Sequence, residues 1–179
     1  TYTLKKHDLE VCWEVVNNDS ETMYFTIGGH PAFRVPVREG ESQSDYRLAF
    51  EGLDTLTYLL IDTSVGTVLA DEPHTLSLEN GTCSIAPHMF DKDALVFDNG
   101  QIQKAGILFP DGTPYLTLTS EGFPNFGIWS VPGAPFVCLE PWMGRCDDCG
   151  FEKPLSEKAN INVLKPDEEF IKSYQITVH

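Results

Sequence analysis

Short apolar segments, interrupted every few residues by glycine, proline, asparagine or aspartate, limit the folds open to this chain. From Leu9 to Val15, apolar residues alternate with polar or smaller ones, which is the period of a half-buried strand. Residues 17–20, Asn-Asn-Asp-Ser, then supply turn chemistry. Comparable segments recur at intervals of roughly 8–12 residues, the spacing typical of a β-sandwich or barrel. The sequence therefore predicts an all-β protein.

Further segments share this pattern and are predicted to be strands. They are residues 23–27, 46–50, 57–60, 67–69, 75–78, 94–97, 106–109, 115–119, 127–130, 136–140, 161–164 and 170–179. Helical periodicity is confined to short pieces around residues 89–93 and 154–158. No repeat, low-complexity tract or linker divides the chain. We therefore expect residues 1–179 to form a single domain.

The chain is strongly acidic, with 12 Lys+Arg against 27 Asp+Glu and a formal net charge of -15. Such a charge repels phosphate backbones and anionic lipid surfaces, so neither nucleic acid nor a membrane is expected as a partner. The sequence contains no apolar run of about 18 residues for a membrane helix. It also lacks a basic segment followed by an apolar one near its start, as a secretory signal would have. We expect a cytoplasmic protein.

The five cysteines are scattered, which suggests reduced thiols rather than a disulfide framework. Cys146 and Cys149 have the CxxC spacing of zinc and redox sites. A structural zinc site needs four ligands, and no second CxxC or HxxxH motif completes one. Asp147 and Asp148, between the two cysteines, would raise the pKa of a thiol by like-charge repulsion. Metal and redox functions are therefore not expected.

The segment Phe136-Val-Cys-Leu-Glu-Pro-Trp142 delivers one carboxylate at the end of an apolar run. Proline cannot donate to a sheet ladder, so the strand is predicted to end before Pro141, which leaves Glu140 at the rim of a sheet beside Trp142. A carboxylate beside an aromatic ring is the setting of an acid/base site that handles sugars. It is also what a salt-bridged strand end looks like, because a buried charge must be paired or protonated.

A second candidate lies in the segment Gly28-Gly-His-Pro-Ala-Phe33, directly after a predicted strand. The paired glycines allow a sharp turn or a close approach to a ligand. Pro31 restricts His30 to extended backbone and holds its imidazole on a rigid corner. Histidine has an unperturbed pKa close to neutral, which suits a proton donor. The alternative is a histidine that only caps a turn.

Together these motifs resemble the aldose 1-epimerase (galactose mutarotase-like) family, within it the small bacterial branch with GGHPAF-type sequences. Blocks along almost the whole chain carry the resemblance through their order and spacing: residues 16–18, 28–33, 93–97, 123–124, 128–129, 139–142, 144 and 164–168.

The resemblance implies a large antiparallel β-sandwich, often called a supersandwich, that binds a free sugar in a cleft over one sheet. The family's catalytic glutamate corresponds to Glu140 and its catalytic histidine to His30. A family aspartate that hydrogen-bonds sugar hydroxyls corresponds to Asp93. The family's more N-terminal part has no counterpart here, so we expect a sandwich without its N-terminal strands and an incomplete cleft. Arg34 stands where many mutarotases have asparagine.

The activity implied by the resemblance is interconversion of the α and β anomers of a free hexose, such as galactose or glucose. Glu140 would act as the base and His30 as the acid in opening the pyranose ring, without metal or cofactor. Trp142 and Phe90 would cover apolar patches of the sugar, as aromatic rings do in such sites, while Trp129 fits ordinary core packing better. Arg34 would be a further substrate contact.

Other functions stay open at the level of sequence. A non-catalytic carbohydrate-binding sandwich would use the same histidine and glutamate as hydrogen-bonding partners. An epimerase of a phosphorylated hexose would need a cationic cluster, for which Arg34 and Arg145 are the arginines beside the motifs. A cupin-like metalloprotein would need clustered histidines, and these are dispersed. The sequence specifies neither the sugar nor the oligomeric state.

Overall fold

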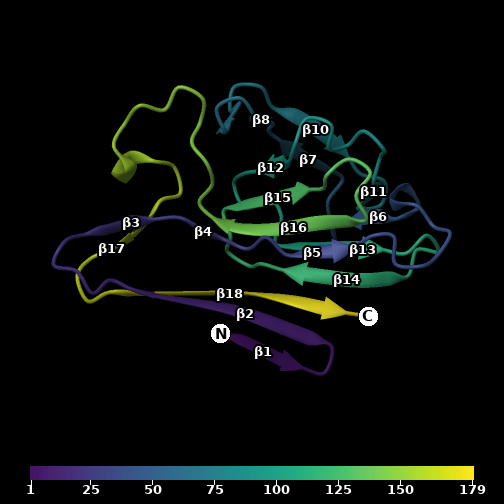
Figure 1. The fold of residues 1–179 in the computed structure, drawn as a ribbon, viewed down its shortest axis with the longest axis horizontal. Helices are drawn as coiled ribbons and strands as arrows, with labels where there is room; N and C mark the ends of the chain where they lie inside the picture. Colours follow the sequence, from purple (N-terminus) through teal and green to yellow (C-terminus); the bar gives the residue numbers. More distant parts are fainter.

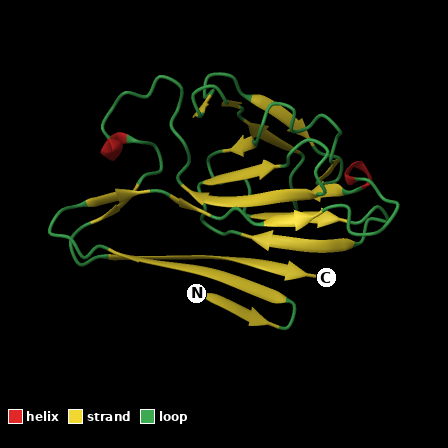
Figure 2. Cartoon of the chain, in the orientation of Figure 1, coloured by secondary structure: helices red, strands yellow, loops and turns green.

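The computed structural model describes residues 1–179 and consists almost entirely of antiparallel strands and the turns between them (Figures 1 and 2). Its helical turns are the short 3₁₀ helices η1 (Gln43–Asp45) and η2 (Leu155–Glu157). None of its helices has the length and apolar character that crossing a membrane requires. The predicted all-β class is confirmed. The helical piece expected at residues 89–93 is wrong, because these residues form successive turns that end at Asp93, whose φ is 72°.

The first sheet has seven strands. In spatial order they are β1 (Tyr2–Lys5), β2 (Asp8–Val16), β18 (Glu169–Val178), β14 (Pro114–Thr119), β13 (Lys104–Leu108), β6 (Arg47–Ala49) and β11 (Thr82–Ser84). The long strands β2 and β18 pair along almost their whole length, so the beginning and the end of the chain lie side by side (Figure 1).

The second sheet carries the candidate site. It consists of β12 (Leu95–Phe97), β15 (Asn125–Trp129) and β16 (Phe136–Met143), with β4 (Ile27–Gly28) and β5 (Ala32–Arg34) both along the outer edge of β16. Three strand pairs complete the fold: β7 (Thr55–Tyr58) with β10 (His74–Ser77), β8 (Ile61–Asp62) with β9 (Thr67–Val68), and β3 (Met23–Phe25) with β17 (Asn162–Leu164).

The hydrophobic core lies between the two sheets. Ile107 and Leu118 point into it from the seven-stranded sheet, and Phe126, Val137 and Leu139 point into it from the five-stranded sheet. All five are almost completely buried and alternate along their strands with residues on the other face, as the pleat requires. This packing makes the fold a β-sandwich, as predicted.

Pro141 lies inside β16, although the sequence predicted that the strand would end before it. Pro141 pairs with Phe126 of β15, and β16 continues to Met143. The Pro141 carbonyl faces the other edge, where it accepts a hydrogen bond from the Gly29 N–H (2.9 Å). In an antiparallel strand the N–H and C=O of one residue point to the same side, so the N–H that proline lacks falls in the gap between β4 and β5. Glu140 therefore lies in mid-strand on a sheet face, and the prediction of a rim position is wrong.

We expect Phe126→Ala to lower the free energy of unfolding by about 3–5 kcal/mol, because it opens a cavity where the two sheets meet. Urea denaturation followed by circular dichroism measures this change. Val65→Ala, at an exposed turn, is the control and should stay within about 0.5 kcal/mol of the wild type. Equal midpoints for Phe126→Ala and the control would contradict the assigned core.

Candidate active site on the five-stranded sheet

Strand β16 presents three chemically distinct side chains on the face that points away from the core. Cys138, Glu140 and Trp142 alternate with the core residues Val137 and Leu139, so all three lie on this outer face. Glu140 and Trp142 border a hollow on this face, whereas Cys138 is completely buried.

Two glycines on the neighbouring strands make room for the indole of Trp142. A Cβ atom added to Gly127 of β15 would lie 2.3 Å from Trp142 Cζ2, and one added to Gly28 of β4 would lie 2.5 Å from Trp142 Cδ1. Neither distance occurs between real atoms, so both positions must lack a side chain for the indole to rest on the sheet. Gly127 pairs with Glu140, so the indole occupies the space beside the carboxylate on that strand.

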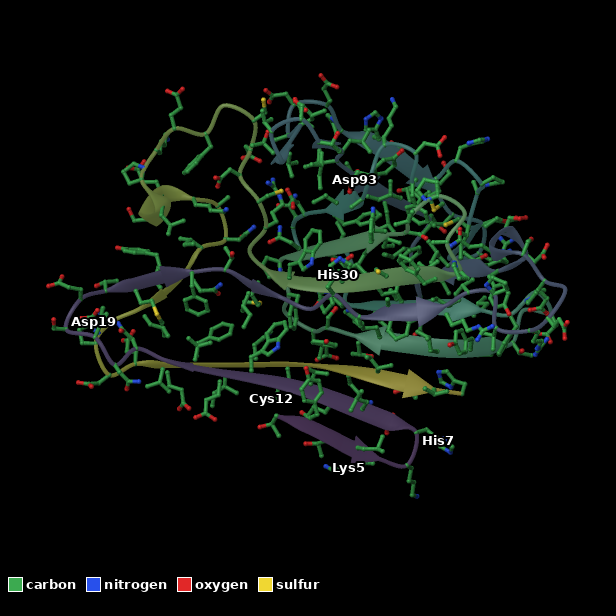
Figure 3. The ribbon with its side chains drawn as sticks, viewed as in Figure 1. Lys5, His7, Cys12, Asp19, His30 and Asp93 are labelled. Carbon is green, nitrogen blue, oxygen red and sulfur yellow. The ribbon has the colours of Figure 1, made fainter.

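His30 is held over β16 by the crossing from β4 to β5. The Gly29 N–H donates to the Pro141 carbonyl, and the Leu139 N–H donates to the Pro31 carbonyl at 3.4 Å. These contacts place His30 Nδ1 3.4 Å from Glu140 Oε1, with the imidazole edge-on to Trp129 at a centroid distance of 5.7 Å. The His30 side chain is 60% exposed, whereas that of Glu140 is 5% exposed. Figure 3 shows His30 beside β16 on the crossing strand segment.

Burial dominates the electrostatics of Glu140. Removal from water raises the pKa of its carboxyl from 4.5 to about 7, the neighbouring His30 and a hydrogen bond from Trp142 lower the pKa, and the charge of Asp93 raises it. The group therefore changes its charge near neutral pH. Burial, followed by the charge of Glu140, also raises the pKa of the Cys138 thiol to about 12.

Two hollows flank this group of side chains. One, of about 410 Å³, is lined by His30, Glu140 and Trp142 and is called the Glu140 hollow. The other, of about 700 Å³, is lined by Asp93 and Trp129 and is called the Asp93 hollow. Ile61 lines both, and the contact between Trp129 and His30 joins them. Both volumes lie in the range of roughly 300–1,000 Å³ that small-molecule sites have.

The structure brings Asp93 to the same face but gives Phe90 a mixed position. Asp93 precedes β12 and accepts a hydrogen bond from the Ala94 N–H through Oδ1 (2.6 Å), which fixes its carboxylate beside the Asp93 hollow. Figure 3 marks its place beyond His30 on the sheet. Phe90 is buried in the main core and only borders the Asp93 hollow. The Phe90 ring therefore packs mainly against the hydrophobic core of the sandwich.

The structure does not bring the two motif arginines into the site as free cations. Arg34 is exposed on β5 and lines neither hollow; its charge acts on Tyr115 of the other sheet. Arg145 does line the Glu140 hollow, but its guanidinium is held by Asp98 (2.8 Å) and Asp148 (2.7 Å). Burial opposes the charge of Arg145, and hydrogen bonds to these two carboxylates raise its pKa in spite of it.

Cys146 of the CxxC pair lines the Glu140 hollow. Cys146 and Cys149 are free thiols, and Cys149 is exposed. Burial is the main cause that raises the pKa of Cys146, whereas Asp147 is a minor one. The expected direction is therefore right, but its principal cause is desolvation rather than the aspartates.

Comparisons with known proteins agree on one relationship. No family model matches the chain. The plasmid and chromosomal forms of protein LacX from Lactococcus lactis subsp. lactis are each 29% identical over 180 residues, covering 99% of this chain and 60% of the relative. A galactose mutarotase related enzyme from Lactobacillus acidophilus superposes with a TM-score of 0.89 at 28% identity, covering 99% of this chain and 59% of that one. A galactose mutarotase-like protein from Lactobacillus casei gives 0.82 at 26% identity, with coverages of 99% and 61%.

The chain is similar in sequence and fold to galactose mutarotase-like proteins. The resemblance predicted from the sequence motifs is thereby confirmed. The chain spans about 60% of the length of the curated relatives it matches.

Two further residues on this outer face were not assigned to the candidate site from sequence. Trp129 was predicted to be core, yet it borders the Asp93 hollow and contacts the His30 imidazole. Cys138 carried no motif, although its place two residues before Glu140 in a strand puts it on the same face. That period-two relation was the available signal. It was hidden by the assumption that Glu140 stood at a strand end.

We expect Gly127→Ala to push the Trp142 indole off the sheet, because the added methyl group overlaps Cζ2. Intrinsic tryptophan fluorescence and urea denaturation should both change. In a Trp142→Ala background the same substitution should lower the free energy of unfolding far less. The double-mutant cycle should then give a coupling energy of about 0.5–3 kcal/mol. Additive effects of the two substitutions would contradict the stacked geometry.

We expect stability to fall as pH rises through the range in which buried Glu140 ionises. Its pKa in the folded protein, about 7, lies above its ordinary value of 4.5, so the folded state binds more protons than the unfolded state between these values. The contribution is complete below pH 4.5 and is lost as pH rises past 7. Glu140→Gln removes it, so the free energy of unfolding of this variant minus that of wild type should increase from pH 5 to pH 8, by on the order of 1–3 kcal/mol. Urea denaturation at both pH values tests this, and a difference independent of pH would contradict it.

Proposed function

We propose that this chain carries the acid–base pair of an aldose 1-epimerase, with Glu140 as the base and His30 as the acid, and that its substrate is a free hexose. The observation that carries the proposal is the contact between His30 Nδ1 and Glu140 Oε1 at 3.4 Å on a hollowed sheet face. Because the chain spans about 60% of its curated relatives, the activity of the whole protein is part of this proposal.

The positions of the two groups suit the reaction. The anomeric hydroxyl and the ring oxygen of a pyranose are bonded to the same carbon, so a carboxylate and an imidazole that lie side by side can reach both oxygens. Glu140 is fixed by burial in a strand, whereas the exposed His30 side chain has room to adjust when a sugar enters. A carboxyl pKa near 7 makes Glu140 a stronger base than an ordinary carboxylate.

The reaction proceeds by two proton transfers in each direction. The Glu140 carboxylate takes the proton of the anomeric hydroxyl, while the protonated His30 gives a proton to the ring oxygen, and the bond between C1 and the ring oxygen breaks to leave the open aldehyde. Rotation about the C1–C2 bond turns the other face of the carbonyl toward the ring oxygen. The reverse transfers then close the ring as the other anomer and restore both residues.

The surroundings of the pair suit a sugar. Trp142 and Trp129 offer aromatic surfaces on either side of the pair, and Asp93 provides a carboxylate for sugar hydroxyls. The phosphorylated hexose finds less support, because Arg145 is already held by two carboxylates and Arg34 lies away from the hollows.

The test is the rate at which freshly dissolved α-galactose or α-glucose approaches anomeric equilibrium, followed by polarimetry. We expect the protein to accelerate it, and Glu140→Gln or His30→Gln to lower kcat by about 10²–10⁴-fold, since each removes one proton-transfer group. The matched controls, Glu121→Gln and His7→Gln at exposed positions, should keep the wild-type rate.

Full activity in Glu140→Gln would contradict the assignment of the base. Binding of the sugar without faster anomer exchange, observed through the anomeric protons by NMR, would instead identify a carbohydrate-binding protein that lacks catalysis.

A further inference from the structure

The outer face of β16 places the thiol of Cys138 beside the carboxylate of Glu140 and the imidazole of His30. One donor atom each from His30, Cys138 and Glu140 all lie within 4.8 Å of one another, and no other His, Cys, Asp or Glu residues of the structure form such a group of three or more. Cys138 and Glu140 come from the same strand two residues apart, and His30 comes from the crossing above it.

We propose that His30, Cys138 and Glu140 form a binding site for a thiophilic divalent cation of the Zn²⁺ type, which competes with the sugar for the acid–base pair. A nitrogen, a sulfur and an oxygen donor match the ligands that Zn²⁺ takes, and a thiolate selects against Mg²⁺ and Ca²⁺. Three protein ligands leave a fourth position for water, which is the pattern of an open rather than a structural site.

The distances allow such a site after a small adjustment. Zinc–ligand bonds of about 2.0–2.3 Å place tetrahedral donors roughly 3.3–3.8 Å apart. The separation between His30 Nδ1 and Glu140 Oε1, 3.4 Å, already meets this requirement. The sulfur must be approached by the exposed His30 side chain, which is the one member free to move, because Cys138 and Glu140 are fixed on a central strand.

The charges around the site favour a cation. The protein carries a net charge of -15, and the Asp93 carboxylate acts on Glu140 from the neighbouring hollow. The cation that borders the Glu140 hollow, Arg145, is paired with Asp98 and Asp148, so it opposes an incoming ion weakly.

Binding has a defined proton balance. The Cys138 thiol releases its proton to solvent as the sulfur–metal bond forms, and Glu140 and His30 bind the ion only in their unprotonated forms. The lone pairs used for the metal are those that would accept and carry protons in ring opening. The inhibition rests on the proposed mutarotase function, whereas the metal binding does not.

The decisive experiment for binding uses Co²⁺ as a spectroscopic probe and Zn²⁺ in calorimetry, both with the full chain. We expect one ion per chain, a thiolate-to-cobalt charge-transfer band in the near ultraviolet, and visible bands with the intensity of a four-coordinate site. Cys138→Ser should lose the charge-transfer band and weaken Zn²⁺ binding at least about tenfold, since loss of even an outer-shell partner has an effect of 10–100-fold.

The control variant replaces both Cys146 and Cys149 by serine and should keep the band and the affinity. Loss of binding in this control, or an unchanged cobalt spectrum in Cys138→Ser, would overturn the proposed site. Circular dichroism of Cys138→Ser checks that the fold is intact, and His30→Ala, at an exposed position, provides a second ligand variant that should also weaken Zn²⁺ binding.

Inhibition is measured separately by polarimetry. Zn²⁺ should slow mutarotation by wild type, and the sugar should relieve this effect, whereas Cys138→Ser should stay active in Zn²⁺ concentrations that inhibit wild type. Equal inhibition of both proteins would overturn the competitive role. If the protein does not accelerate mutarotation at all, the cobalt spectrum still decides the metal site, so failure of the two proposals can be told apart.

Discussion

The arrangement of the site depends on one interruption in the hydrogen bonding of β16. On its inner side this strand pairs continuously with β15, but along its other edge β5 and β4 leave a gap that the segment Gly29–Pro31 crosses. The gap accommodates Pro141, which has no N–H to offer, and the crossing chain carries His30 over the sheet face. Proline, paired glycines and histidine thus serve a single structural purpose. The register is the same on both sides of the gap, with Trp142 opposite Gly28 and Cys138 opposite Ala32, so His30 lies opposite Glu140 on the same face of the sheet.

Glu140 shows how the requirements of stability and of the proposed chemistry oppose each other. The burial that raises its carboxyl pKa makes the ionised group a better base, and the same burial makes that ionised group expensive to hold in the folded protein. His30 and Trp142 partly offset this cost. Neighbours of this kind are typical of sites in which the charge of one group has to change during function.

Much of this structure was accessible from sequence, and the failures have physical causes. Strands such as β2 and β14 are predictable because apolar and polar residues alternate along them. In contrast, β5 and β11 are too short to show a period, and their structure depends on pairing with the neighbouring strands. His30 and Glu140 became candidates because their sequence neighbours restrict the backbone. The misplacement of Glu140 came from treating Pro141 as a strand end, since one sequence cannot reveal a gap in a partner strand. The same error hid the fact that Cys138 shares a sheet face with Glu140. Arg34 lies away from both hollows because of the path of the edge strand β5, which the sequence does not specify.

The pairing of β2 with β18 has a consequence for how this protein is made. Residues near position 10 take as their neighbour a strand that begins at Glu169, so the seven-stranded sheet has no local route to completion. While the chain emerges from the ribosome, the edge of β2 that pairs with β18 stays unpaired until β18 has been synthesised. The five-stranded sheet, whose strands lie between Ile27 and Met143, is complete before that point. The sheet that bears His30 and Glu140 can therefore form first. Its apolar inner face becomes fully covered only after β18 has joined the seven-stranded sheet.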